Sequence, residues 1–133
     1  MTYQEVPDLK KTCIDNDFLL KAGAYSHIVE AGGFLFLTGL DPIDLEKELI
    51  ITDDIVRATE IVMENMKRSL ESAGSSLAKV VKVTVFLRDM GDFAKLNEVY
   101  ARYFPVDPPA RTCVAVKEVP GNFQLKVEAI AIK

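Results

Sequence analysis

The sequence predicts an α+β fold, a two-layer sandwich in which two helices cover one face of a mixed six-stranded sheet. Two observations predict it: the elements run in the order hairpin, helix, strand, helix, strand, strand, and one long segment has a clear helical period between runs of β-branched residues. The 133 residues are 49% apolar and 27% charged, a globular composition that fits a single domain over residues 1–133.

The first predicted strands form a hairpin. Residues 25–29 give a short strand, and Gly32-Gly33 supplies the tight turn. Residues 34–38 follow as an almost continuous apolar strand, which indicates burial on both faces. We expect Gly39 to end this strand and a loop to run from 41 to 51.

A long amphipathic helix follows the loop. Thr52 or Asp53 can cap it, because either side chain can accept from the free amides of the first turn. Gly74 is a typical C-terminal stop. The predicted buried stripe is Ile55, Thr59, Val62, Met66, Leu70 and Ala73.

The second half of the chain predicts three strands and one helix. That helix starts at Asp92 and ends before Pro105, with Phe93, Leu96, Tyr100 and Phe104 on its inner face. The strands cover 80–87, 111–116 and 125–132, with a turn at 120–122.

The sheet face without helices also carries apolar residues. Depending on register, these include Phe36, Val114, Val127 and Ala129. An apolar face of this kind indicates packing against another copy of the chain.

Charge and composition exclude several functional classes. The net charge is −4 and the pI is near 5.0, which argues against a protein that binds nucleic acid by neutralising phosphates. The polar stretch 1–17 lacks the apolar core of a signal peptide, and no run is long enough to span a bilayer. Cys13 and Cys113 have no metal-type spacing, and Asp53-Asp54 fits helix capping better than calcium. We therefore expect a cytoplasmic protein with reduced thiols and no bound metal.

Arg111 is the first candidate site residue. It opens a strand of otherwise small and apolar residues, with Cys113 and Ala115 on its own face. Its position fits an edge arginine in a salt bridge, which spacing alone slightly favours. It also fits a guanidinium fork that binds a ligand carboxylate through two hydrogen bonds.

Glu128 is the second candidate, because it interrupts an apolar strand near its middle. It can be a partner of Arg111 or Lys126, or an exposed residue on a polar face. It can also be a general acid/base that holds a water molecule. The residues themselves favour neither interpretation.

Other polar positions are weaker candidates. Tyr25, next to a glycine, and Thr38-Gly39, at a strand end, are places where a backbone can approach a ligand, although turn chemistry alone explains each. Asn97, beside an apolar helix stripe, fits a residue that ties a loop in place. The single histidine, His27, is interpreted as structural, and one histidine makes a catalytic triad hard to assemble.

Seven segments together resemble the RidA/YjgF family of reactive-intermediate deaminases, also labelled endoribonuclease L-PSP. They appear in the family's order from residue 23 to 132. The segments are Gly23–Ser26, Phe36–Gly39, Ala73–Leu77, Val80–Met90, Phe93 with Asn97–Tyr100, Pro109–Cys113 and Val127–Ala131.

The resemblance implies a homotrimer whose sheets form a central barrel, with ligand clefts between subunits. It implies hydrolysis of enamines and imines such as 2-aminoacrylate, 2-iminopropanoate and 2-iminobutanoate to 2-oxo acids and ammonia, without a cofactor. By position, Arg111 would bind the substrate carboxylate and Glu128 would hold the water and shuttle protons. The other implied contacts are Cys113 through its backbone, Tyr25 closing the cleft, Thr38 and Gly39 lining it, and Asn97 supporting its loops.

The chain departs from the family pattern at Ala24, where proline is usual, at His27, where glutamine is common, and at Leu40-Asp41. These departures put the substrate range in question more than the reaction class. A protein of the same fold that binds 2-oxo acids without turnover is an alternative. A ribonuclease or translation inhibitor is disfavoured by the acidic charge and by the lack of a His/His or His/Lys pair.

Overall fold

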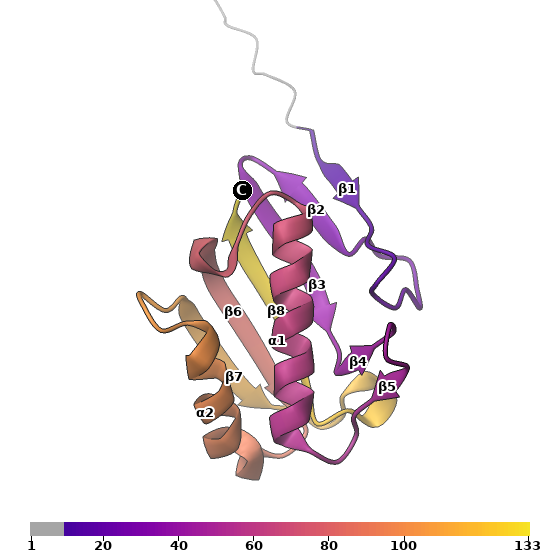
Figure 1. Cartoon of the computed structure of the whole chain (residues 1–133), viewed down its shortest axis with the longest axis vertical. Helices are drawn as coiled ribbons and strands as arrows, with labels where there is room; N and C mark the ends of the chain where they lie inside the picture. Colours follow the sequence, from indigo (N-terminus) through magenta and orange to yellow (C-terminus); the bar gives the residue numbers. More distant parts are fainter. Residues whose placement is uncertain (1–9) are drawn as a thin grey trace, which may run out of the picture.

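A computed structural model describes residues 10–133 (Figure 1). Most of the polar 1–17 stretch, on which the signal-peptide expectation depends, lies outside the described residues. The elements are β1 (Thr12–Ile14), β2 (Ile28–Ala31), β3 (Phe34–Leu40), β4 (Ile43–Asp44), β5 (Leu49–Ile50), α1 (Ile55–Ser72), β6 (Val80–Leu87), α2 (Phe93–Tyr103), β7 (Ala110–Ala115) and β8 (Leu125–Ile132). Short 3-10 turns lie at Leu77–Lys79, Met90–Asp92 and Pro120–Asn122.

Six strands form one mixed sheet, as predicted. Its order is β1-β2-β3-β8-β6-β7, and only β6 and β7 run parallel. The parallel pair is joined by α2, the crossover that parallel strands require. Both helices lie on the same side of the sheet (Figure 1), which confirms the two-layer α+β architecture.

The hairpin forms around the two predicted glycines. Gly32 and Gly33 both have positive φ, 59° and 84°, as a two-residue turn between twisted strands requires. Its first strand begins at Ile28, so the prediction of a strand from Tyr25 was wrong: Tyr25 lies in the preceding loop.

Strand β3 does not end at Gly39 but continues to Leu40, with an irregularity in its pairing to β8. Leu37 pairs with Ala129 and Leu40 with Val127, so Thr38 and Gly39 together face Glu128 alone. Two residues opposite one make a β-bulge, which locally changes where the side chains point.

The long helix α1 has the predicted extent, but its N-terminal cap is Asp54 rather than Thr52 or Asp53. Asp54 Oδ1 accepts a hydrogen bond from the backbone N–H of Arg57 at 3.1 Å. Its C-terminal stop is Gly74, with φ 80°. The residues buried along the helix include all the predicted stripe except Ala73, which is half-buried.

Helix α2 also differs at its start. Asp92 makes no capping hydrogen bond, and Asp89 instead accepts from the backbone of Gly91 to cap the preceding 3-10 turn. Three short strands were not predicted from the sequence: β1 and the β4–β5 pair, which lies inside the predicted loop 41–51. Such short strands have too few residues to show a period.

The core lies between the helices and the inner sheet face. Val127 and Ala129, two of the residues suggested for the free face, are buried in this core, since the β8 register turns them toward the helices. On the free face, Phe36 is 44% exposed and Val114 39%. The prediction that β3 is buried on both faces is therefore wrong for the single chain, because only its inner face is buried.

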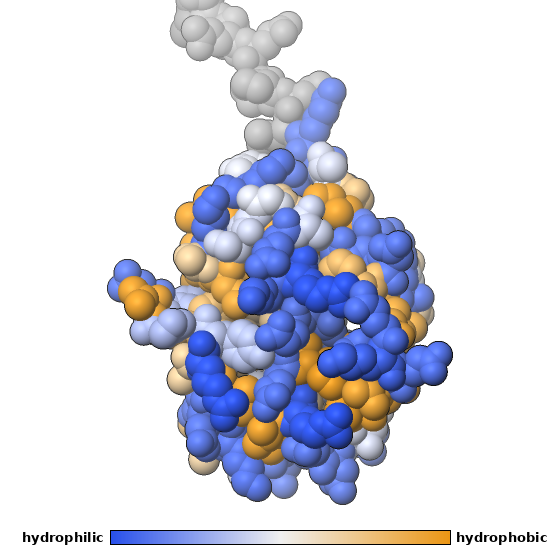
Figure 2. Space-filling model, in the orientation of Figure 1, coloured by the Kyte–Doolittle hydropathy of each residue, from blue (hydrophilic) through white to orange (hydrophobic). Residues whose placement is uncertain are grey.

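The helix side of the molecule carries mostly polar and charged residues over α1 (Figure 2). Within residues 10–133, no helix is long and apolar enough to cross a membrane. The same residues contain no group of three or more His, Cys, Asp or Glu side chains arranged to hold a metal ion.

Candidate functional site

Arg111 lies half-buried on the edge strand β7, on the helix side of the sheet. Its guanidinium carbon lies 4.7 Å from the ring centre of Tyr100 and 5.6 Å from that of Phe93, both on α2. Within the described residues, the Arg111 side chain forms no ion pair. The predicted edge position is therefore confirmed, whereas the salt bridge expected there does not form within the described residues. Two aromatic rings instead hold a charged fork that has no anionic partner within residues 10–133.

Tyr100 forms the inner wall of this arrangement. Burial raises the pKa of its hydroxyl to about 12, although Arg111 acts to lower it. The phenol therefore stays neutral at physiological pH, and its ring supports the guanidinium without competing for it as an anion.

Cys113 follows on the same face of β7 and packs against the core. Burial raises the pKa of its thiol, and the nearby Arg111 charge opposes this shift only in part. A protonated thiol is a poor nucleophile. The role implied for Cys113, a contact through its backbone, does not need a reactive thiol and stays a prediction. Asn97 on α2 is half-buried, and its side chain makes no hydrogen bond within residues 10–133.

Glu128 points to the opposite, helix-free face of the sheet. Its register neighbour is Thr84 on β6, which in turn pairs with Thr112 on β7, whereas Arg111 pairs with the buried Val83. Glu128 is exposed, and in the described part of the chain it has no ion-pair partner, so pairing with Arg111 or Lys126 was not confirmed. Within one chain, Arg111 and Glu128 therefore point to opposite faces of the sheet.

A shallow hollow surrounds Glu128 on that outer face. It is lined by Phe36, Leu37, Lys82, Thr84, Glu128, Ala129 and Ile130. Of these residues, Leu37 and Ala129 have their side chains in the core, whereas Phe36 and Ile130 lie on the outer face beside one carboxylate, one ammonium and one hydroxyl group. The hollow is thus suited to a small ligand with a few polar atoms.

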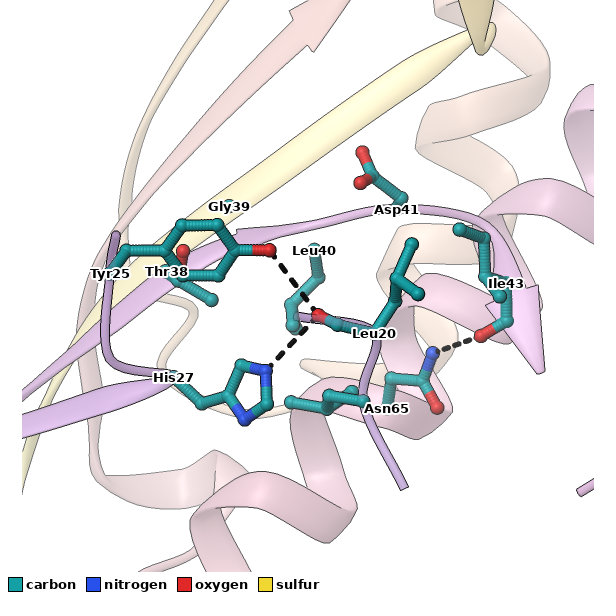
Figure 3. Close-up of a pocket in the computed structure, with 10 residues that line it drawn as sticks. Leu20, Tyr25, His27, Thr38, Gly39, Leu40, Asp41, Ile43 and Asn65 are labelled. Carbon is teal, nitrogen blue, oxygen red and sulfur yellow. Dashed lines mark hydrogen bonds between the residues drawn. The ribbon is translucent and has the colours of Figure 1, made fainter. Parts of the chain in front are cut away.

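Tyr25, Thr38 and Gly39 meet at a second cavity, beside the β3 bulge (Figure 3). Tyr25 reaches it from the loop before β2 and lines it together with Thr38 and Gly39. The remaining lining residues are Leu19, Leu20, His27, Leu40, Asp41, Ile43 and Asn65. This cavity and the hollow share strand β3, which lines the cavity with Thr38 and Gly39 and the hollow with Phe36.

An ion pair that the sequence analysis missed crosses the bulge. Lys126 Nζ lies 3.1 Å from Asp41 Oδ1, and both side chains are about three-quarters buried. A Cβ on Gly39 would lie 2.7 Å from Lys126 Cδ, so any other residue at this position would force the lysine side chain to shift. Burial raises the pKa of Asp41, while Lys126 acts to lower it. Asp41, one of the departures from the family pattern, thus pairs with Lys126. The two residues are 85 positions apart, so the sequence gives no local sign of this contact.

A sequence model described as Endoribonuclease L-PSP matches residues 17–133. A RutC family protein of Pyrococcus horikoshii is 50% identical over 111 residues, which cover 84% of this chain and 88% of that protein. The chain belongs to the endoribonuclease L-PSP family, which is the RidA/YjgF family of the sequence analysis.

Other RidA-family relatives carry more specific names. Reactive Intermediate Deaminase A of Arabidopsis thaliana, named as chloroplastic, is 36% identical over 82% of this chain and 58% of its own length. The crystal structure of RidA from an Antarctic Psychrobacter has 34% identity and a TM-score of 0.85, covering 92% of this chain and 99% of that one. Escherichia coli TdcF, crystallised with bound serine, has 32% identity and a TM-score of 0.85, with coverage of 92% and 98%. The RidA fold is therefore confirmed.

Proposed function

We propose that this RidA-family protein is a homotrimer that hydrolyses reactive enamines and imines, such as 2-aminoacrylate, 2-iminopropanoate and 2-iminobutanoate, to 2-oxo acids and ammonia. One observation carries the proposal: Arg111 is held on two aromatic rings without an anionic partner in residues 10–133. A guanidinium prepared in this way matches the carboxylate that all these substrates share.

The proposed cleft lies between two subunits. In one chain Arg111 and Glu128 point away from each other, so a second copy must bring them together. Strand β7 is an edge, and the outer sheet face is apolar enough to receive it. One subunit would supply Arg111 and Cys113. The next would supply Glu128 with the Tyr25, Thr38 and Gly39 wall.

Imine hydrolysis needs only a few catalytic groups in such a cleft. An imine carbon is already electrophilic, so a held water molecule can add to it directly. As the C–O bond forms, Glu128 would take one proton from that water and pass it to the imine nitrogen, which gives a carbinolamine. Glu128 would then move the remaining hydroxyl proton to the nitrogen as the C–N bond breaks and ammonia leaves. The products are one 2-oxo acid and one ammonia, and the sum of atoms equals one imine and one water.

The test couples the protein to a serine or threonine dehydratase and follows 2-oxo acid release. We expect Arg111→Ala and Glu128→Gln each to abolish the acceleration, and Arg57→Ala, an exposed residue of α1, to leave it unchanged. No acceleration by the wild type, or full acceleration by Arg111→Ala, would contradict the proposal.

Mixed trimers test whether the cleft is shared. When the Arg111→Ala and Glu128→Gln chains are refolded together in equal amounts, three trimers in four are mixed, and each holds one intact cleft of three. Activity should return to roughly a quarter of the wild-type value. If it stays at the level of the separate variants, the two residues do not act across an interface.

A non-catalytic binding protein is the second candidate, because TdcF holds a serine in its crystal structure. In that case 2-oxobutanoate would bind at Arg111 with no effect on imine hydrolysis. Calorimetric titration of wild type and Arg111→Ala, alongside the coupled assay, separates the two functions.

A further inference from the structure

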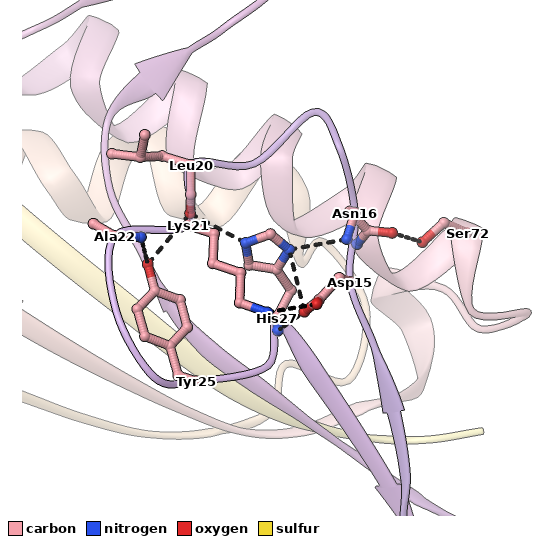
Figure 4. Close-up of polar contacts among 8 residues, drawn as sticks. All are labelled: Asp15, Asn16, Leu20, Lys21, Ala22, Tyr25, His27 and Ser72. Atoms are coloured by element: carbon pink, nitrogen blue, oxygen red, sulfur yellow. Dashed lines mark hydrogen bonds and ion pairs between the residues drawn. The ribbon is translucent and has the colours of Figure 1, made fainter.

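A buried hydrogen-bond network surrounds His27, the only histidine of the chain (Figure 4). The side chain of His27 is 2% exposed and lies between the loop 15–26 and the core. Nδ1 accepts from the backbone N–H of Asn16 at 2.9 Å, and Nε2 lies 3.1 Å from the carbonyl oxygen of Leu20.

These two contacts fix the proton on the ring. A nitrogen that accepts a hydrogen bond carries no proton, and a nitrogen beside a carbonyl oxygen must donate one. His27 is therefore a neutral imidazole with its proton on Nε2. Asp15 instead accepts from the backbone N–H of His27 at 3.1 Å and pairs with Lys21 at 2.6 Å.

The carbonyl of Leu20 is shared with Tyr25. The Tyr25 hydroxyl donates to this oxygen at 3.3 Å and accepts from the backbone N–H of Ala22 at 3.0 Å. The rings of Tyr25 and His27 lie 6.1 Å apart on either side of it. The position of Tyr25 over the cavity thus depends on the same loop carbonyl that His27 holds.

The network ties this loop to two rigid elements. The backbone N–H of Thr38 on β3 donates to the His27 carbonyl at 2.9 Å. The Ser72 hydroxyl on α1 donates to Asn16 Oδ1 at 3.1 Å. His27 is the buried centre of a loop that is otherwise exposed from Leu20 to Tyr25.

We propose that His27 is a positioning residue that holds the Tyr25 loop closed over the cavity at Thr38 and Gly39. Its role in turnover rests on the proposed function; the closure of the loop does not. The His27 side chain also lines this cavity, but backbone groups occupy both of its ring nitrogens, so it acts through Tyr25.

Because His27 is the only histidine, ring ¹⁵N labelling gives one pair of NMR signals. We expect an unprotonated Nδ1 and a protonated, slowly exchanging Nε2 in the full-length protein at neutral pH. A proton on Nδ1, or two averaged signals typical of an exposed ring, would overturn the proposal.

Loop opening is read out by trypsin cleavage after Lys21, located by mass spectrometry. We expect His27→Leu, which leaves the Asn16 N–H and the Leu20 carbonyl unpaired, to be cleaved about tenfold faster or more. His27→Gln should restore part of the protection, because its amide offers one acceptor and one donor. The control Thr59→Val removes an equally buried hydrogen bond within α1 and should leave cleavage unchanged.

The remaining measurements are the kinetic constants for the imine and the affinity for 2-oxobutanoate. With Tyr25 displaced, KM for the imine and Kd for 2-oxobutanoate should rise about tenfold in His27→Leu while kcat changes little. Unchanged cleavage and unchanged KM in folded His27→Leu would overturn the proposal. If the wild type neither hydrolyses imines nor binds 2-oxobutanoate, the proposed function is wrong. The tautomer and cleavage results alone then decide whether His27 closes the loop.

Discussion

Replacing Phe36 with serine removes the largest apolar group at the Glu128 hollow and should dissociate the proposed trimer. Phe36 lies on the outer sheet face, where it is 44% exposed in the single chain. Its neighbour across the strand pair is Ile130 on β8, so the substitution leaves the buried core untouched.

The magnitude follows from the area that assembly would cover. A phenylalanine offers about 200 Å², so 44% leaves about 90 Å² per chain for a neighbour to bury. At about 25 cal/mol per Å², this contributes about 2 kcal/mol for each subunit and about 6 kcal/mol for a trimer. The association constant of the trimer should fall by roughly four orders of magnitude.

Sedimentation equilibrium over a range of protein concentrations measures this change, and the coupled dehydratase assay measures activity on the same samples. Activity should fall together with the trimer, because each cleft needs two chains. Ile50→Ser is the matched control: Ile50 is 62% exposed on the separate β4–β5 pair and should change neither quantity. A Phe36→Ser protein that remains fully associated, or that is active as a monomer, would refute this reasoning.

Three further substitutions test individual contacts. Lys126→Met leaves the Asp41 carboxylate unpaired, so it should lower the free energy of unfolding by about 1–2 kcal/mol at pH 7. The loss should be smaller near pH 4, because the raised pKa of Asp41 lets this carboxylate become neutral as the pH falls. Equal losses in denaturant titrations at both pH values would contradict this. Iodoacetamide should modify exposed Cys13 before Cys113, whose thiol pKa is raised by burial, and peptide mass mapping at pH 8 would show the reverse order if this is wrong. Asp54→Ala should cost about 1 kcal/mol through the lost helix cap, whereas Asp53→Ala should be nearly neutral by thermal unfolding.

The sequence alone determined most of the architecture. Helix α1 was predictable because eighteen residues repeat the helical period five times, and the hairpin because paired glycines favour the positive φ of its turn. The same local signals failed where tertiary contacts compete. Strand β3 continues past Gly39 because β8 pairs with it beyond the glycine. Helix α1 begins at Ile55, so Asp54 rather than Asp53 stands at its capping position.

The candidate site, too, was predicted only in part from the sequence. The sequence placed Arg111 on a strand edge and Glu128 within a strand, and strand alternation told which neighbours share each face. Only the register of β6 with β7 and β8 decided that the two side chains leave the sheet on opposite sides.

Long-range pairs were likewise beyond the sequence. The contact of Lys126 with Asp41 and that of His27 with Asn16 join segments whose pairing depends on how loops return to the sheet. Periodicity carries information about a residue's own element, whereas register and loop closure are set by the packing of the whole chain. For this reason the sequence determined which residues are candidates for the site, and the tertiary structure decided that one chain does not bring Arg111 and Glu128 together.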